Sequence, residues 1–165
     1  MTVKKKIYMN TLETTHFTSP LGLIMIQVQK QTVRSCYFDD EPHVQNNTTY
    51  DSPTLTAVMH QLQEYFQGQR KHFVLELAPQ GSTFDQLVWQ QLSTIAYAST
   101  VSYQDIASAI GRPQAARAVG QAIGRNPLAI LIPCHRIIRR QGTWGGYSAG
   151  LWRKTWLLEH EHHYQ

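Results

Sequence analysis

The second half of the chain takes its fold from residues 101–124, VSYQDIASAIGRPQAARAVGQAIG. Ser102 and Asp105 have the spacing of a capping box, which predicts the start of a short helix. Gly111 suits a left-handed helix end. The segment 114–123, which follows a proline, has the composition of a second helix with small residues on one face. A helix, a tight turn and a small-faced helix outline a helix-turn-helix.

Another capping box opens the helix before this motif, at either Ser82-x-x-Asp85 or Thr83-x-x-Gln86. The apolar residues that follow share one helical face: Phe84, Leu87, Val88, Leu92 and Ile95. Upstream, Ala78-Pro79-Gln80-Gly81 combines a helix breaker with the most permissive backbone residue. We therefore expect a domain boundary there, with one domain over 1–80 and another over 81–165.

The N-terminal domain has the pattern of a small α/β fold. Stretches rich in β-branched and aromatic residues predict strands at 7–9, 21–28, 32–38 and 73–77, with a hairpin turn at 29–31. One helix is expected from Ser52-Pro53 to about Gly68, with an apolar face of Leu55, Val58, Met59, Leu62 and Phe66. The predicted fold class is α+β: a small α/β domain followed by a mainly helical domain with a helix-turn-helix.

The charge of the chain is unevenly distributed. Up to Ala98 there are 7 basic and 8 acidic residues, whereas from Ser99 onward there are 8 basic and 3 acidic ones, for a total charge of +4. A basic C-terminal half beside a neutral N-terminal half is typical of a nucleic-acid-facing module joined to one that does not touch phosphate. A solvated basic face is the alternative interpretation.

The sequence carries no sign of a membrane or disulfide protein. No apolar run has the length of a membrane span, and the basic start, MTVKKKIYMN, lacks the apolar core of a signal peptide. Cys36 and Cys134 are far apart and form no CxxC motif, so neither a disulfide framework nor a cysteine metal knuckle is expected. We expect a cytoplasmic protein with Cys36 in a strand core and a frayed, solvated tail, HEHHYQ.

A potential nucleophile follows the apolar run 128–132, where the chain enters Pro133-Cys134-His135-Arg136. The thiolate is the reactive form of cysteine, and it requires nearby positive charge, a helix N-terminus or a general base. His135, Arg136, Arg139 and Arg140 are candidates for that role. A free cysteine next to an apolar strand is, however, more often a small buried hydrophobe, so these residues alone leave both interpretations open.

The motif around this cysteine resembles the active-site signature of the O6-alkylguanine-DNA alkyltransferases. The signature is PCHRII, preceded by Asn126-Pro127 and followed by Gly146-Tyr147. The resemblance extends over roughly residues 83–161, in four ordered blocks: FDQLVWQQL, VSYQDIASAIGRPQAARAVGQAIGRNP, ILIPCHRII and RKTWLLEHE. It implies a ribonuclease H-like N-terminal domain and DNA repair by irreversible, single-turnover transfer of an alkyl group from guanine O6 to a cysteine.

The resemblance also implies a role for each matching residue of the site. Cys134 is the alkyl acceptor, His135 the base that withdraws its proton through a water, and Glu161 the carboxylate that orients the imidazole. Asn126 ties the approach to the cysteine turn. Tyr103 donates its hydroxyl toward the leaving guanine, where charge develops as the alkyl group departs. His160 has a structural role, and neither a cofactor nor a metal is expected.

A guanine inside a duplex leaves no room for in-line attack at its alkyl group, so the nucleotide is expected to rotate out of the stack. The resemblance makes Arg117 the residue that fills the gap from the minor groove. The expected partner is double-stranded DNA containing O6-alkylguanine, bound with little sequence preference by a monomer. The remaining residues expected to contact DNA or the base are Ala115, Ala116, Arg136, Tyr147, Ser148 and Lys154.

Four alanines depart from residues common in the family, namely Ala96, Ala98, Ala129 and Ala149. They leave the substrate range open, including alkyl size and O4-alkylthymine. Three other functions compete with repair. An oxidant-sensing regulator predicts sequence-specific DNA binding, an alkyltransferase-like protein that only recognises damage lacks the acceptor cysteine, and a Cys-His hydrolase predicts more than one turnover.

Overall fold

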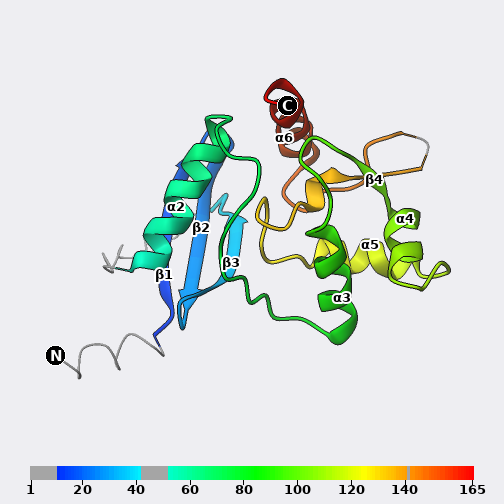
Figure 1. Cartoon of the computed structure of the whole chain (residues 1–165), viewed down its shortest axis with the longest axis horizontal. Helices are drawn as coiled ribbons and strands as arrows, with labels where there is room; N and C mark the ends of the chain where they lie inside the picture. Colours follow the sequence, from blue (N-terminus) through cyan, green and yellow to red (C-terminus); the bar gives the residue numbers. More distant parts are fainter. Residues whose placement is uncertain (1–10, 42–51, 141) are drawn as a thin grey trace. The chain divides into compact units, whose positions relative to one another are not determined.

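A computed structural model of the chain describes residues 11–41, 52–140 and 142–165. The chain divides into two compact units, residues 1–79 and 80–165 (Figure 1). Among the described residues, no helix has the length and apolar character needed to cross a membrane.

The first unit is built on an antiparallel sheet of three strands in the order β1-β2-β3. The strands are β1 (Glu13–Ser19), β2 (Gly22–Gln29) and β3 (Thr32–Phe38). Lys30 and Gln31 both have positive φ, 52° and 63°, as a two-residue hairpin turn requires. The predicted strands 21–28 and 32–38 are confirmed. The Thr-rich β1 was not predicted, because its polar residues lack the alternation that indicates a strand.

Helix α2 (Pro53–Phe66) lies along one face of this sheet (Figure 1). It begins as predicted, with the Ser52 hydroxyl accepting from the Leu55 amide. Phe66 stacks on Phe17 of β1 at 6.0 Å between ring centroids. The predicted apolar face is correct except at Met59, which is partly exposed, while Tyr65 is fully buried.

The predicted strand at 73–77 is wrong. Only Leu77 forms a bridge, parallel to Val33, and Val74 is 77% exposed. The side chain of Gln61 instead bonds the backbone of Val74 on both sides, accepting from its N–H at 2.8 Å and donating to its C=O at 2.9 Å. These bonds satisfy the backbone groups that a neighbouring strand would use. The predicted strand at 7–9 lies outside the described residues.

Cys36 lies in β3 and is fully buried, as expected for a core residue. Burial raises the pKa of its thiol to about 12. The thiol therefore stays protonated at neutral pH and has little nucleophilic character.

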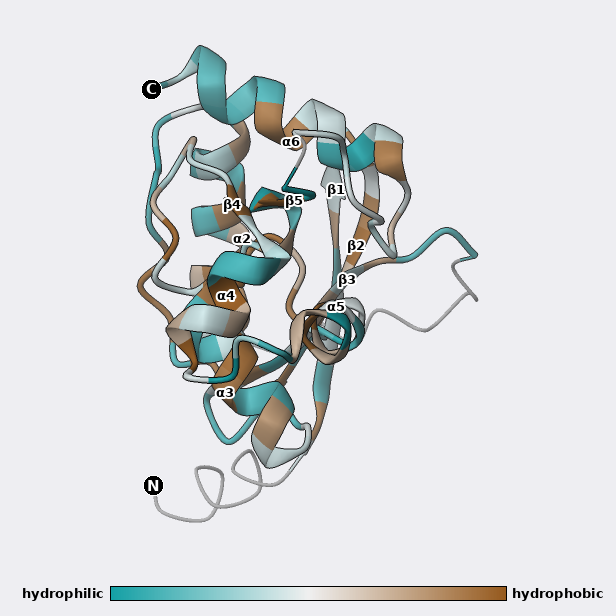
Figure 2. Cartoon of the chain, turned by 90° about the vertical axis from the view of Figure 1, so that its right-hand side faces the viewer, coloured by the Kyte–Doolittle hydropathy of each residue, from teal (hydrophilic) through white to brown (hydrophobic). Residues whose placement is uncertain are grey.

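The second unit is mainly helical. Its elements are α3 (Thr83–Leu92), β4 (Val101–Ser102), α4 (Tyr103–Ala109), α5 (Ala116–Gly124), the 3-10 helix η1 (Cys134–Arg136), β5 (Ile137–Ile138) and α6 (Leu151–His163). Helices α3, α4 and α5 pack on one another. In Figure 2, hydrophobic and hydrophilic segments alternate along α3 and α6, as in helices with one buried face.

Both predicted capping boxes are present, at Ser82 with Asp85 and at Ser102 with Asp105. Gly111 has a φ of +71°, as its predicted place after the helix requires. Helix α5 begins two residues later than expected, because Pro113 and Gln114 belong to the turn. Helices α4 and α5, with the turn between them, are compatible with the predicted helix-turn-helix.

The tail is not frayed as expected, although residues 162–165 are exposed. Helix α6 continues to His163 and therefore contains most of HEHHYQ. His160 stacks on Trp156 at 4.8 Å between ring centroids and contacts the tilted ring of Tyr164 at 4.9 Å, and Glu161 is fully buried. These buried side chains fix the last turns of the helix.

Candidate active site

The turn that leads into Cys134 is held by the side chain of Asn126. Its Nδ2 donates to the carbonyl of Ile132 at 3.0 Å and to Sγ of Cys134 at 3.1 Å. Its Oδ1 accepts from the Leu128 amide at 3.0 Å. One amide side chain thus connects the beginning of the turn, its end and the sulfur atom.

The backbone of this turn is unusually tight. The Leu131 amide bonds the Ala129 carbonyl around Ile130, and the Cys134 amide bonds the Ile132 carbonyl around Pro133, both at 2.8 Å. These are two γ-turns in succession. Ile130 has a φ of +71°, which is strained for a β-branched residue, and it is held there by complete burial. The strained turn fixes where the cysteine enters the site.

Cys134 is buried, with 5% of its surface exposed. Burial raises the pKa of its thiol, while the Asn126 hydrogen bond, the charge of Lys154 and the hydroxyl of Tyr147 lower it. Burial has the larger effect, so the pKa of the thiol stays above its ordinary value and the donors around the sulfur only lessen the increase.

A buried ionic cluster lies directly behind the cysteine. Nε2 of His135 is 2.8 Å from Oε1 of Glu161. Arg136 binds the same carboxylate with two parallel hydrogen bonds of 2.9 Å and donates to the Ile95 carbonyl at 2.7 Å. The backbone amide of Ala98 adds a further bond to Glu161, at 3.0 Å. All lone pairs of this carboxylate face donors.

The cluster has a defined protonation state at neutral pH. Burial alone would raise the pKa of Glu161, but the bonds and charges of His135 and Arg136 hold it well below its usual range. Burial lowers the pKa of His135, against the raising effect of Glu161, so the imidazole is neutral. Since the carboxylate only accepts, Nε2 carries the proton and Nδ1 is the basic nitrogen. Within the described residues, Nδ1 is buried and has no protein hydrogen-bond partner.

Lys154, on α6, is fully buried next to this cluster. Its ammonium group donates to the carbonyls of Ile137 and, at 3.4 Å, of Gly145. Burial lowers its pKa to about 8. Lys154 therefore links the strand after the cysteine to the loop that bears Tyr147, and it places a cation near the sulfur.

A cavity of about 530 Å³ opens onto Cys134. This volume is within the range of small-molecule sites. Tyr103 lines it from the start of α4, and the backbone of Gly145 lies so close to this ring that an added Cβ would collide with the hydroxyl. The described residues that line it are Tyr103, Gly120, Ile123, Gly124, Cys134, Arg139, Gly146, Tyr147 and Ser148.

The structure brings most of the predicted site residues together. Cys134, Tyr103, Tyr147 and Ser148 line the cavity, and Asn126, His135, Glu161 and Lys154 lie behind it. Ala115, Ala116 and Arg117 do not line it but lie at the start of α5, where Arg117 is exposed. Among the described residues, no group of three or more His, Cys, Asp or Glu side chains is arranged to hold a metal ion.

The expectation that Arg136 contacts DNA or the base does not agree with its position. The side chain is 7% exposed, and its guanidinium is bonded to Glu161 and to the Ile95 carbonyl. A carboxylate 25 positions away thus keeps this arginine in the interior, because a buried Glu161 requires a paired cation.

Both parts of the chain match models of known domains. Residues 83–163 match the DNA binding domain of 6-O-methylguanine DNA methyltransferase, and residues 13–79 match its ribonuclease-like domain. The chain belongs to the 6-O-methylguanine DNA methyltransferase family. The resemblance found in the sequence is therefore confirmed, as is the ribonuclease-like nature of the N-terminal part.

Methyltransferases of this family resemble the chain over most of its length. A constitutive methylated-DNA–protein-cysteine methyltransferase of Bacillus subtilis is 42% identical over 147 residues, which is 86% of each chain. The crystal structure of O6-methylguanine methyltransferase of Mycobacterium tuberculosis superimposes with a TM-score of 0.83 at 36% identity, covering 94% of this chain and 95% of that one. A complex of the M. tuberculosis protein with DNA matches with a TM-score of 0.82 at 37% identity, over 92% of this chain and 93% of that one.

Sequence reasoning missed part of the cavity of this methyltransferase. Gly120 and Gly124 are four positions apart on α5, which is the spacing of residues on one helix face. That spacing could have indicated a helix face without side chains, which another group can approach closely. Gly146 was noted only as part of the family signature, and because it lies in a loop without periodicity no place in the cavity was predicted for it. Arg139 was considered only as a source of positive charge for the thiol.

Proposed function

We propose that this protein repairs DNA by transferring an alkyl group from the O6 atom of guanine to Sγ of Cys134, once and irreversibly. The observation that carries the proposal is the position of this sulfur. It lies in the wall of a cavity large enough for a base, bonded to Asn126 and adjacent to the buried pair of His135 and Glu161. The names of the relatives, methylated-DNA–protein-cysteine methyltransferases, support the same reaction.

The chemical step is a direct displacement. A water takes the thiol proton to Nδ1 of His135, the basic nitrogen of a neutral imidazole. Sγ then bonds to the alkyl carbon as the bond from carbon to O6 breaks, and the electron pair stays on the purine. The purine finally takes up one proton from solvent, to which the imidazolium returns its own, and remains in the DNA as guanine. Glu161 remains an anion throughout and stabilises the imidazolium.

The reaction ends after one turnover because its product is a thioether. A carbon–sulfur bond of this kind is not hydrolysed by water, and among the described residues that line the cavity there is no second thiol to take the group from Cys134. One chain therefore removes one alkyl group, and we propose that it acts as a monomer. Residues 81–165 bind DNA and carry out the transfer, and residues 1–80 support them.

The transfer is tested by mass. After incubation of the protein with DNA containing O6-methylguanine, we expect the intact mass to rise by one methyl group and the Cys134 peptide to carry it. The gain should saturate at one equivalent per chain. Unmethylated Cys134 in the presence of remaining substrate would refute the proposal, and turnover above one would instead favour a hydrolase.

We also propose that Arg117 fills the gap left when the damaged nucleotide rotates out of the duplex. It is exposed near the start of α5, beside the small residues Ala115 and Ala116, which permit a close approach to DNA. Binding is expected to weaken with rising salt and to depend little on sequence.

Replacing Arg117 by alanine is expected to slow methyl transfer by roughly 10-fold or more in duplex DNA, because the energy of unstacking is then uncompensated. The loss in single-stranded DNA should be much smaller, since no stack has to be filled. Single-turnover rates on the same methylated oligonucleotide, with and without its complement, measure the difference. Equal losses on both substrates would refute the stack-filling role and leave a phosphate contact.

A further inference from the structure

Arg139 is placed beside Tyr103 by the short parallel sheet of the second unit. Strand β4 pairs with β5 so that Val101 lies opposite Ile137 and Ser102 opposite Ile138. The next residues in this register are Tyr103 and Arg139. The backbone of Arg139 is fixed by a tight turn, because its amide donates to the Thr143 carbonyl at 3.0 Å and its carbonyl accepts from Gly142 at 2.9 Å.

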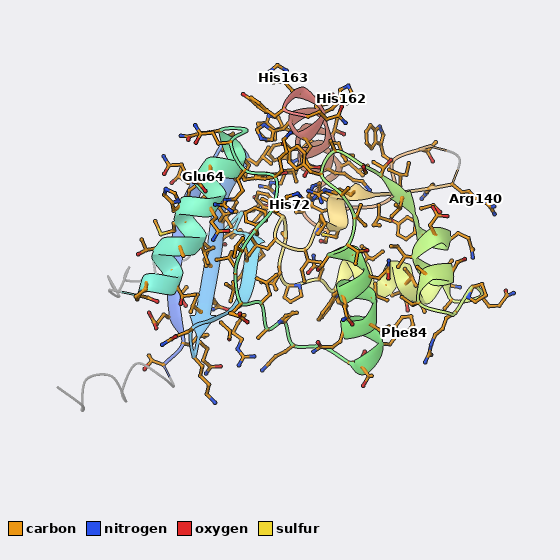
Figure 3. All side chains as sticks on the ribbon, viewed as in Figure 1. Glu64, His72, Phe84, Arg140, His162 and His163 are labelled. Atoms are coloured by element: carbon orange, nitrogen blue, oxygen red, sulfur yellow. The ribbon has the colours of Figure 1, made fainter. Side chains whose placement is uncertain are left out.

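The side chain of Arg139 lines the same cavity as Cys134 and Tyr103. Within the described part of the chain, no carboxylate lies at ion-pairing distance from its guanidinium. The neighbouring Arg140 differs, since it does not line the cavity and its charge acts on Asp105. Figure 3 shows Arg140 extending outward from the loop after β5.

The field of Arg139 acts on the phenol of Tyr103. Burial raises the pKa of Tyr103, and Arg139 opposes this increase. A cation that acts on this hydroxyl acts on any anion bound beside it, because attraction in a partly closed site is stronger than in water. The cavity therefore offers positive potential on the side occupied by Tyr103.

The displacement creates negative charge in this cavity. As the bond from the alkyl carbon to O6 breaks, its electron pair moves onto the purine and spreads over O6 and the ring nitrogens. We propose that Arg139 is a catalytic residue whose guanidinium, together with the Tyr103 hydroxyl, faces this developing anion and stabilises the leaving guanine. Arg139 gives up no proton in the step, since arginine stays charged. The inference rests on the proposed alkyl transfer.

A contact with a DNA phosphate is the competing explanation for an arginine at the mouth of such a cavity. Phosphate contacts contribute to binding, whereas stabilisation of the leaving group contributes to the chemical step. The free base O6-methylguanine separates the two roles, because it has the leaving group of the reaction and no phosphate.

The test compares single-turnover methyl transfer to Cys134, followed by intact mass, from free O6-methylguanine and from a methylated duplex. The variants are Arg139→Ala, Arg139→Lys and, as a control of equal charge in the same loop, Arg140→Ala. Arg139→Ala should be slower on the free base by roughly 10- to 100-fold. This range is below the 10²- to 10³-fold typical of an enclosed donor, because Arg139 is exposed. Arg139→Lys should retain part of the rate, and Arg140→Ala should match the wild type.

The outcomes are distinct. If Arg139→Ala accepts methyl from the free base at the wild-type rate but binds the duplex more weakly, the inference is overturned. Arg139 would then be a phosphate contact. No methyl on Cys134 of the wild-type protein with either substrate would refute the proposed function itself. Since Arg139 is exposed, the thermal midpoints of all three variants should equal that of the wild type, which shows that a lost rate is not lost folding.

Discussion

Replacing Cys134 by alanine is expected to abolish methyl transfer completely, while the variant still folds and binds methylated DNA. Among the described residues, the substitution removes the only sulfur that lines the cavity. The fold should tolerate it, because Asn126 keeps its bonds to the Ile132 carbonyl and to the Leu128 amide. Intact mass after incubation with O6-methylguanine DNA measures transfer, and a binding titration with the same duplex measures recognition.

Cys36→Ala is the matched control for this experiment. Cys36 is also a buried free thiol, but its pKa is raised to about 12 and it lies in β3, in the first unit. Its alanine variant should transfer methyl groups at the wild-type rate. Methylation of Cys134→Ala at any residue, or loss of transfer in Cys36→Ala with an unchanged fold, would contradict the assignment of the acceptor.

Replacing Glu161 by glutamine is expected to reduce both stability and transfer. The carboxylate receives two bonds from Arg136, one from His135 and one from the Ala98 amide, all in the interior. Glutamine leaves the buried Arg136 charge without a counterion, which costs about 3 kcal/mol of unfolding free energy. It also removes the anion that orients the imidazole of His135 and stabilises its protonated form, so we expect transfer to slow by on the order of 100-fold.

The matched control is Glu159→Gln, on the exposed side of the same helix. It makes the same chemical change two positions away. It should alter neither the unfolding free energy nor the rate of transfer, since exposed charges contribute little to stability. Chemical denaturation gives the unfolding free energies and single-turnover mass measurements give the rates. Wild-type stability of Glu161→Gln would show that the cluster does not hold this helix.

Lowering the pH is expected to reduce the stability of the folded protein in two stages, first through His135 and then through Glu161. His135 has a lowered pKa in the folded protein, so the unfolded chain, with an ordinary value near 6.5, binds the proton first and stability falls as the pH drops below about 6.5. Glu161 also has a lowered pKa. The stability it contributes is complete above its unfolded value, near 4.3, and is lost as the pH falls through its folded value. The difference between wild type and Glu161→Gln should therefore narrow below about pH 4.3.

The features that the sequence predicted correctly depend on neighbouring residues. The capping boxes at Ser82 and Ser102 place a hydroxyl and a carboxylate three positions apart, and both boxes form as expected. The hairpin turn at 29–31 lies between two strands that were predicted. The strand predicted at 73–77 does not form. The side-chain amide of Gln61, which is distant in the sequence, occupies the backbone N–H and C=O of Val74 that a strand would use to pair with a neighbour.

The features of the active site also divide into those that the sequence indicated and those that long-range contacts decided. The contiguous motif Pro133-Cys134-His135-Arg136 alone left open whether Cys134 is a nucleophile or a buried hydrophobe, and the roles of Cys134 and His135 were predicted from the resemblance over residues 83–161. Only the tertiary structure decided that Arg136 faces inward to Glu161 and that Arg139 lies next to Tyr103 in the cavity wall. The physical reason is burial: a sequence shows which residues carry charge, but the folded chain determines which charges lose their water and must find a partner.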